Sequence, residues 1–353
     1  MAVAAPFRIA RPLINISGRD QGSLSERLIA LTTVESASGL YRCEAQFGNW
    51  GTSGTNIDFL FFDRQMLDFG KPFGVKMGTD MIFEGRIMGI EANYPQGNAP
   101  SISVLVEDRL QDLRMTRRTR TFDDVTDEDV FNRIASDHGL TPNIDVPGGT
   151  HKVLAQVNQS DLAFLRERAR AMDADLSVSG TTLHVKMRPN RADSPIELIY
   201  GQSLREFVAL ADLAMQRTHV VVSGWDVEGK AAIRHEAEAG VISGELNGDT
   251  SGISILQSAI GERKEVLAHT VPLTTQDAEA EAEAVFRMSA RRFVTGRGIS
   301  EPDPQMKVGA FVDLKNLGPL FSGHYYLTEV RQVFDARGIR TEFTAERPGI
   351  GQA

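Results

Sequence analysis

The segment FEGRIMGIEANY at residues 83–94 has a counterpart in FSGHYYLTEV at residues 321–330. In each segment a Phe is followed two residues later by a Gly and, after six further residues, by a Glu, with an apolar strand between them. The matching residues are Phe83, Gly85 and Glu91 in the first segment, and Phe321, Gly323 and Glu329 in the second. This spacing predicts that two β domains of the chain share one plan.

The position of the two segments favours duplication over chance. Each lies late in a β region of similar size, and Gly70 or Gly309 precedes its Phe by a similar distance. Three matched residues alone can also arise by chance among β hairpins. We expect both Phe side chains to be core residues, and Gly85 and Gly323 to permit a tight turn or a close approach of two backbones.

Outward from the first segment, short apolar stretches separated by glycine-containing turns run from Pro12 to about Arg109. This pattern predicts an antiparallel barrel or sandwich over residues 1–120. Around the second segment, residues 339–346 alternate apolar or small residues with charged and polar ones, which is the period of a strand with one solvent-facing side.

A different pattern separates these two regions. Thr126 with Asp129 forms a capping-box pattern before an apolar helical face, and Ser160 precedes a second helix. A hairpin turn is expected at Ser179 and Gly180. We therefore expect residues 121–190 to form a small α+β module, which ends at the proline-bearing stretch RPNRADSP.

The third region, residues 191–353, is expected to be a second β domain with a long loop at about 239–265 and a helix at about 277–293. The helix follows Thr274, carries acidic residues early and arginines late, and so matches the helix dipole. The expected fold class is mostly β with α+β elements, in which two related antiparallel β-barrel domains are separated by a small α+β module.

Composition narrows the functional classes. The 353 residues carry a formal net charge of -9, which argues against a general nucleic-acid binder because such binders need a surplus of Lys and Arg. The single cysteine, Cys43, cannot form an internal disulfide. The start of the chain has no signal-peptide pattern, and no apolar stretch is long enough to span a bilayer. We expect folding in a reducing cytoplasm and no stable membrane association.

Catalytic, cofactor and metal motifs are not found in the sequence. The GTSG at residues 51–54 lacks the spacing of a nucleophile elbow, and no Walker A sequence occurs. The seven histidines are scattered; His235 with Glu236 comes closest to an H-E-x-x-H motif, but residue 239 is Ala. The sequence predicts no catalytic residues, no cofactor and no metal.

Two charged groups have alternative interpretations. The carboxylate clusters Asp173/Asp175 and Asp127-Glu128-Asp129 resemble acid/base pairs or calcium ligands. The first lacks the glycine and terminal Glu of an EF-hand loop and the second lies at a helix start, so both are expected to be structural. The one basic concentration lacks interleaved aromatic residues, so a subunit or interdomain contact is expected rather than a nucleic-acid surface. It consists of Arg114, Arg117, Arg118 and Arg120, with Arg109 before it.

Three separated segments carry a family resemblance. VEDRLQDLRMTRRTRTF from residue 106, VNQSDLAFLRERARAMDADLSVSGTTLHV from residue 157 and GAFVDLKNLGPLFSGHYYLTEVRQVFD from residue 309 resemble the phage late control gene D proteins. That family includes the baseplate hub of contractile phage tails and the N-terminal hub part of VgrG and its injection-system relatives. The resemblance covers most of residues 15–346 in the same order.

The resemblance implies a structural hub and no enzyme. It implies a homotrimer whose two tail-tube-like barrels per chain form a pseudo-hexameric ring, a symmetry adaptor between the hexameric tail tube and a trimeric spike. The expected partners are the tail-tube protein, a spike protein and other baseplate proteins. Because VgrG-like chains continue into a spike and this sequence stops at Ala353, the spike is expected to be a separate polypeptide.

Two alternatives remain. The carboxylate pairs suggest a tail-associated peptidoglycan hydrolase, and the β content suggests a plain tail-tube subunit, against which the length and the α+β module argue. The expected location is the cytoplasm of the producing cell, followed by incorporation into the baseplate of a phage tail or injection particle.

Overall fold

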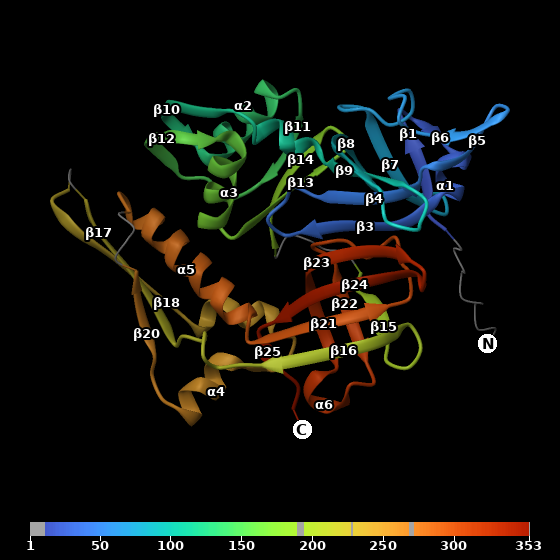
Figure 1. The fold of residues 1–353 in the computed structure, drawn as a ribbon. Coiled ribbons are helices and arrows are strands. Elements are labelled where there is room, and N and C mark those ends of the chain that lie inside the picture. The colour runs from blue at the N-terminus through green and yellow to red at the C-terminus, as the bar shows by residue number, and fades with distance from the viewer. Residues whose placement is uncertain (1–10, 189–193, 227–228, 268–271, 353) are drawn as a thin grey trace.

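The fold is mostly β with α+β elements, as expected (Figure 1). The computed structural model describes residues 11–188, 194–226, 229–267 and 272–352. The predicted boundary near residue 190 falls within residues 189–193 and lies outside the described residues. None of the helices in the described ranges is long and apolar enough to cross a membrane.

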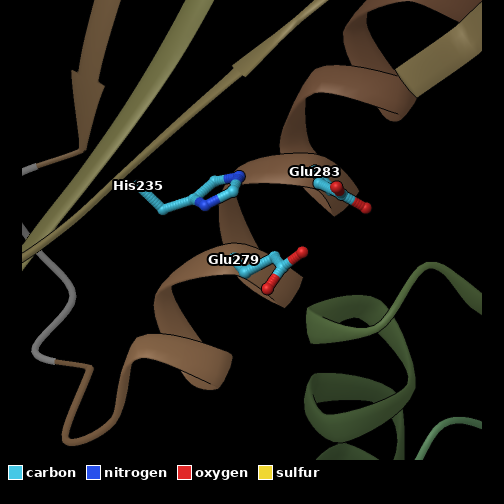
Figure 2. A group of neighbouring side chains, drawn as sticks. All are labelled: His235, Glu279 and Glu283. Atoms are coloured by element: carbon cyan, nitrogen blue, oxygen red, sulfur yellow. The ribbon is translucent and has the colours of Figure 1, made fainter. Parts of the chain in front are cut away.

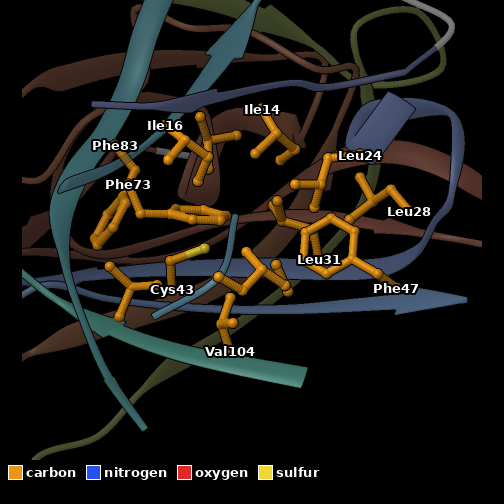
Figure 3. Close-up of a cluster of buried hydrophobic side chains, with 14 of the residues drawn as sticks. Ile14, Ile16, Leu24, Leu28, Leu31, Cys43, Phe47, Phe73, Phe83 and Val104 are labelled. Carbon is orange, nitrogen blue, oxygen red and sulfur yellow. The ribbon is translucent and has the colours of Figure 1, made fainter. Parts of the chain in front are cut away.

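The first β half surrounds a hydrophobic core (Figure 3), in which Phe47, Phe73 and Phe83 are buried together with Cys43. Phe334 and Ile339, from the end of the chain, are buried in the same core. Burial raises the pKa of the Cys43 thiol far above its usual range, which keeps it protonated and unreactive. The elements of this half are β1 (Leu13–Ile16), β2 (Arg19–Asp20), α1 (Gly22–Glu26), β3 (Leu28–Ser36), β4 (Arg42–Gly48), β5 (Trp50–Ser53), β6 (Asn56–Phe59), β7 (Pro72–Met77), β8 (Asp80–Asn93), β9 (Ser101–Glu107) and η1 (Arg109–Leu113).

The following segment packs two helices against short strands around a second core that includes Phe122, Phe131 and Leu165. Thr126 and Asp129 form the reciprocal capping box of the first helix, and Ser160 accepts a hydrogen bond from a backbone N–H of the second. The elements are β10 (Arg117–Thr126), α2 (Asp127–Asp137), β11 (Thr141–Asp145), β12 (Thr150–Ser160), α3 (Asp161–Ala171), β13 (Ala174–Ser179) and β14 (Thr182–Met187).

The second β half surrounds a third core, with Val312, Leu327 and Phe343 among its buried residues. Its strands are drawn from two stretches of the chain that lie on either side of an insertion. The elements are β15 (Ile196–Ile199), β16 (Leu204–Ala211), β21 (Val294–Ser300), β22 (Phe311–Lys315), α6 (Gly318–Phe321), β23 (Gly323–Asp335), β24 (Gly338–Arg347) and β25 (Gly349–Ile350).

The insertion between β16 and β21 is a packed unit with a fourth core, and the loop expected at about 239–265 is not a structureless loop. Ser251 caps a helix whose Ile253 and Leu256 are buried, so an apolar face orders a stretch that its glycines had suggested was irregular. The elements are β17 (His219–Asp226), β18 (Ala231–Glu238), η3 (Ala239–Glu245), β19 (Thr250–Ser251), α4 (Gly252–Ala259), β20 (Lys264–Leu267) and α5 (Thr275–Arg291).

The described strands do not form two separate closed barrels. Both β halves contribute to one 13-stranded sheet, because β3 of the first half pairs antiparallel with β23 of the second. Figure 1 shows these two strands side by side at the boundary between the halves. Because hydrogen bonds cross this boundary, the two halves form one extended sheet, whereas the sequence had predicted two separate barrels.

The two β halves have the same strand order. In the first half the neighbours run β1-β7-β8-β9-β4-β3, and in the second they run β15-β22-β23-β24-β21-β16. When only these six strands of each half are numbered along the chain, with β2, β5 and β6 left out of the first half, both orders are first, fourth, fifth, sixth, third, second. The halves differ at the first strand, since β1 pairs antiparallel with β7 whereas β15 pairs parallel with β22.

Gly85 gives a test of the packing between β8 and β9. A Cβ atom at this position would overlap the backbone carbonyl of Glu107, which cannot swing aside as a flexible side chain can. Gly85→Ala should therefore lower the free energy of unfolding by about 1–3 kcal/mol, measured by urea denaturation. Gly148→Ala is the matched control, because its Cβ would meet no atom within 4 Å. Equal losses in both variants would contradict the close approach.

Candidate assembly surfaces

The junction of β3 with β23 buries a carboxyl group. The two strands face each other from Leu31 opposite Phe334 to Ser36 opposite Glu329. Within this register Glu35 is buried and accepts a hydrogen bond from the backbone N–H of Val308 at 3.0 Å. Burial raises the pKa of Glu35 to about 7, although that hydrogen bond acts in the opposite direction. The junction is thus a tightly packed internal interface.

Two further strand edges carry no partner strand in the described structure. β7 pairs with β8 only as far as Arg86, so the same edge of β8 is open beyond Ile87, where Tyr94 is 62% exposed. β16 ends the sheet and pairs with β21 on one side only. Its Val208 and Leu210 are 73% and 59% exposed. Open edges with apolar side chains are sites where another chain can add a strand.

An aromatic cluster lies beside the open end of β8. Trp50 and Phe59 of the β5–β6 hairpin have ring centroids 5.0 Å apart, Phe59 stacks on Phe62 at 4.7 Å, and Phe62 meets Tyr94 at 6.2 Å. Trp50, Phe59 and Tyr94 are exposed. Exposed aromatic side chains are enriched in protein interfaces, which extends the candidate surface from the β8 edge onto the hairpin.

A buried ion pair joins the α+β segment to the insertion. Asp173, directly after α3, lies 2.6 Å from the Arg291 guanidinium of α5, and both side chains are almost fully buried. Arg291 also binds Glu245 of η3 at 2.6 Å. Burial raises the pKa of the Asp173 carboxyl above its usual range, although the Arg291 charge opposes this.

A second buried group lies close by. Asp175 accepts a hydrogen bond from the Tyr326 hydroxyl, and Arg188 pairs with Glu346 while its guanidinium lies 4.5 Å from the centroid of the Tyr326 ring. Asp173 and Asp175 therefore connect the central segment to the rest of the chain. Buried and paired with cations or a phenol, they offer no support for a hydrolase, because an acid/base pair must reach its substrate.

The predicted arginine group is paired within the chain. Arg114 binds Glu107 at 2.6 Å, and Arg117 donates to the backbone carbonyl of Asn158. Arg118 and Arg120 both reach the buried Asp161, at 3.2 and 2.8 Å. Burial alone would raise the pKa of Asp161, but hydrogen bonds from His138 and Gln156 and these arginine charges hold it below its usual range.

Asp161 thus pairs with two of the four arginines, Arg118 and Arg120. Arg114, Arg117 and Arg118 remain exposed and Arg120 is partly buried, so a contact with another subunit stays a prediction for all four.

The residues of the sequence repeat do not occupy equivalent positions. Phe83 lies in β8 and is buried, whereas Phe321 lies in α6 and is partly buried against the third core. Gly85 lies in a strand where two backbones approach, whereas Gly323 has φ +130° at the start of β23. The matched Phe and Gly residues therefore do not account for the repeated strand order.

Glu91 and Glu329 differ in exposure. Glu91 lies on β8 and is exposed. Glu329 lies on β23, is partly buried and pairs with Arg331 at 2.8 Å.

Three titratable groups far apart in the sequence come together on the insertion (Figure 2). Possible ligand atoms of His235 on β18 and of Glu279 and Glu283 on α5 lie within 4.8 Å of one another. Glu283 already pairs with Arg287 at 2.6 Å, and Glu279 is exposed. We assign no ion to this group. The Glu-x-x-x-Glu spacing was visible in the sequence, but nothing there connects it to His235.

Arg291 offers a test of the buried ion pair. Arg291→Met removes the cation and leaves the Asp173 carboxyl buried without its partner, so the free energy of unfolding should fall by about 3–5 kcal/mol. Arg64→Met breaks the exposed pair with Asp68 and should cost less than about 1 kcal/mol. Chemical denaturation of both variants measures the difference. A loss at Arg291 no larger than that at Arg64 would rule out a structural role for the pair.

Glu35 should make stability depend on pH. Its pKa rises from 4.5 to about 7 on folding, so below pH 4.5 both states hold the proton and the stabilisation is complete. As the pH rises to 7, the unfolded chain releases its proton first and stability falls, by about 3 kcal/mol at pH 8. Glu35→Gln cannot ionise and should lose this dependence.

The measurement is urea denaturation of both proteins at pH 5 and pH 8. Asp108, whose pKa burial also raises to about 7, is present in both proteins, so the comparison isolates what Glu35 adds, including its repulsion with Asp108. A constant difference between wild type and variant across this range would contradict the prediction.

Solved structures of tail proteins share this fold. The 43 kDa tail protein of prophage MuSo2 from Shewanella oneidensis matches with a TM-score of 0.71 at 11% identity, over 96% of this chain and 98% of that chain. A tail protein from Neisseria meningitidis MC58 matches with 0.67 at 10% identity, over 96% and 97%. A type VI secretion system component of E. coli, described as structurally similar to the T4 bacteriophage tail proteins gp27 and gp5, gives 0.57 at 11% identity, over 96% and 79%.

At these identities the likeness establishes a common fold. No curated protein matches the chain significantly. Residues 59–335 match the family model described as the Alg8 N-terminal domain, a description that names a domain and states no activity. Because this match covers more than half of the 353 residues, the chain belongs to the Alg8 N-terminal domain family.

Proposed function

We propose that the protein is a trimeric baseplate hub of a contractile tail or injection system, a structural part without enzymatic activity. The observation that carries the proposal is the repeated strand order of the two β halves, which are joined edge to edge in one sheet. The fold shared with tail proteins and with a type VI secretion system component supports the same role.

The repeated order supplies a reason for three copies. A chain with two similar β halves presents two similar units, and three such chains present six. A ring of this kind would match a hexameric tail tube on one side and a trimeric spike on the other, which is the task of a symmetry adaptor. The domain plan proposed for the chain is residues 1–120 and 191–353 for the two tube-like units and residues 121–190 for the module between them.

The proposed partners follow from this role. They are further copies of the chain, the tail-tube protein, a separate spike protein and other baseplate proteins, without specific nucleic acid or a stable membrane contact. Arg114, Arg117, Arg118 and Arg120 are candidate contacts to a neighbouring subunit. The hub would be made in the cytoplasm of the producing cell and incorporated into the particle.

Copy number tests the hub proposal. The expected result is three copies per baseplate ring, located between tube and spike in images of particles that carry a label on this chain. The purified chain should form a trimer at high concentration and bind its tube or spike protein, measured by sedimentation. Six copies per ring would indicate a tube subunit. Cell-wall turnover by the purified chain, lost in an Asp173→Ala variant that stays folded, would indicate a hydrolase.

A further inference from the structure

β8 and β23 can be aligned through a shared backbone irregularity. The pairing of β8 with β9 shifts directly after Ile87, and the pairing of β23 with β24 shifts directly after Leu327. At each of these bulges a glycine binds from the other side: the Gly70 N–H donates to the Ile87 carbonyl at 2.8 Å, and the Gly309 N–H donates to the Leu327 carbonyl at 3.0 Å. Ile87 and Leu327 are therefore equivalent positions.

The alignment extends across each half to β3 and β16. From Ile87 and from Leu327, the directly opposed residues can be followed through three neighbouring strands. They are Val106, Cys43 and Thr33 in the first half, and Ala345, Gly296 and Ala209 in the second. Thr33 of β3 therefore corresponds to Ala209 of β16.

Only one of the two equivalent edge contacts is made within the chain. Thr33 lies opposite Gln332, five residues beyond Leu327. The equivalent contact would place Ala209 opposite Ala92, five residues beyond Ile87. No described strand occupies either of these two edges, and the chain itself does not pair them with each other. A second copy can.

We propose that β16 of one copy pairs antiparallel with residues 89–94 of the next copy, in a register that places Leu210 opposite Glu91 and Val208 opposite Asn93. This inference rests on the proposed hub assembly and names the surface that closes it. This contact between chains has the same strand pairing and register as the contact of β3 with β23 within the chain. It covers the exposed side chains of Val208, Leu210 and Tyr94 and pairs backbone groups that are otherwise left to solvent.

The register can be tested by charge. Leu210→Glu places a carboxylate directly opposite Glu91 of the next copy, and like charges opposed across a strand pair repel. In sedimentation experiments on the full chain, this variant should need at least about a tenfold higher concentration for half-assembly. The double variant Leu210→Glu with Glu91→Lys should restore the wild-type value. Val266→Glu, at an equally exposed position on β20, is the control and should assemble normally.

Cysteine pairs give an independent reading of the register. Asn93→Cys with Val208→Cys places two sulfur atoms on directly opposed residues, close enough for a disulfide between copies, whereas Asn93→Cys with Glu206→Cys is two residues out of register. Oxidation should link the first pair into covalent oligomers and leave the second largely unlinked.

The outcomes separate the two proposals. A trimer that is indifferent to Leu210→Glu, or that links both cysteine pairs equally, overturns the strand pairing and leaves the hub intact. Register-specific linkage in a ring of another size supports the pairing and overturns the trimeric hub. A wild-type chain that stays monomeric even with its tube and spike proteins overturns both.

Discussion

The antiparallel pairing of β3 with β23 is the contact on which the rest of the architecture depends. It brings residues 31–36 against residues 329–334 and makes one sheet from two β halves at opposite ends of the chain. Their aligned backbones exchange hydrogen bonds, and Glu35 is buried beside them at the cost of a raised pKa. Phe334 and Ile339 of the second half are also buried in the core of the first half, so apolar packing accompanies the strand pairing.

The central segment is held by charge as well as by packing. Asp173 and Asp175 lie at its end and reach Arg291 and Tyr326, which belong to later parts of the chain. Buried ion pairs add little net stability compared with apolar packing, but removing one partner is costly because the other charge stays buried. Such pairs therefore specify how the segment docks, which explains two carboxylates that suggested an acid/base pair in the sequence.

Local signals in the sequence predicted local structure well. Thr126, Ser160 and Thr274 lie where their side chains cap helices, because capping depends on a few neighbouring residues. The ordered stretch around α4 was missed, since its glycines masked a short apolar face.

The continuous sheet could not be predicted, because strand partners nearly a whole chain apart leave no local mark. The repeat was inferred from Phe83 and Phe321, yet the backbone bulges at Ile87 and Leu327 align the strands two residues out of step with those side chains. For the same reason the sequence could not predict that β16 is an edge strand, because this depends on which strands pair with it in the folded chain. Likewise, the approach of His235 to Glu279 and Glu283 depends on the packing of β18 against α5.

Carrying two similar units on one polypeptide also changes how a ring would assemble. The β3 and β23 edges belong to one chain, so their pairing is intramolecular and its rate does not depend on protein concentration. A six-unit ring then has three contacts between molecules, whereas six separate subunits would have six. The edges of β16 and β8 differ from each other, so each contact between copies is head-to-tail. The angle between the two halves at the β3·β23 junction then determines whether the successive copies close into a ring or continue as a helix.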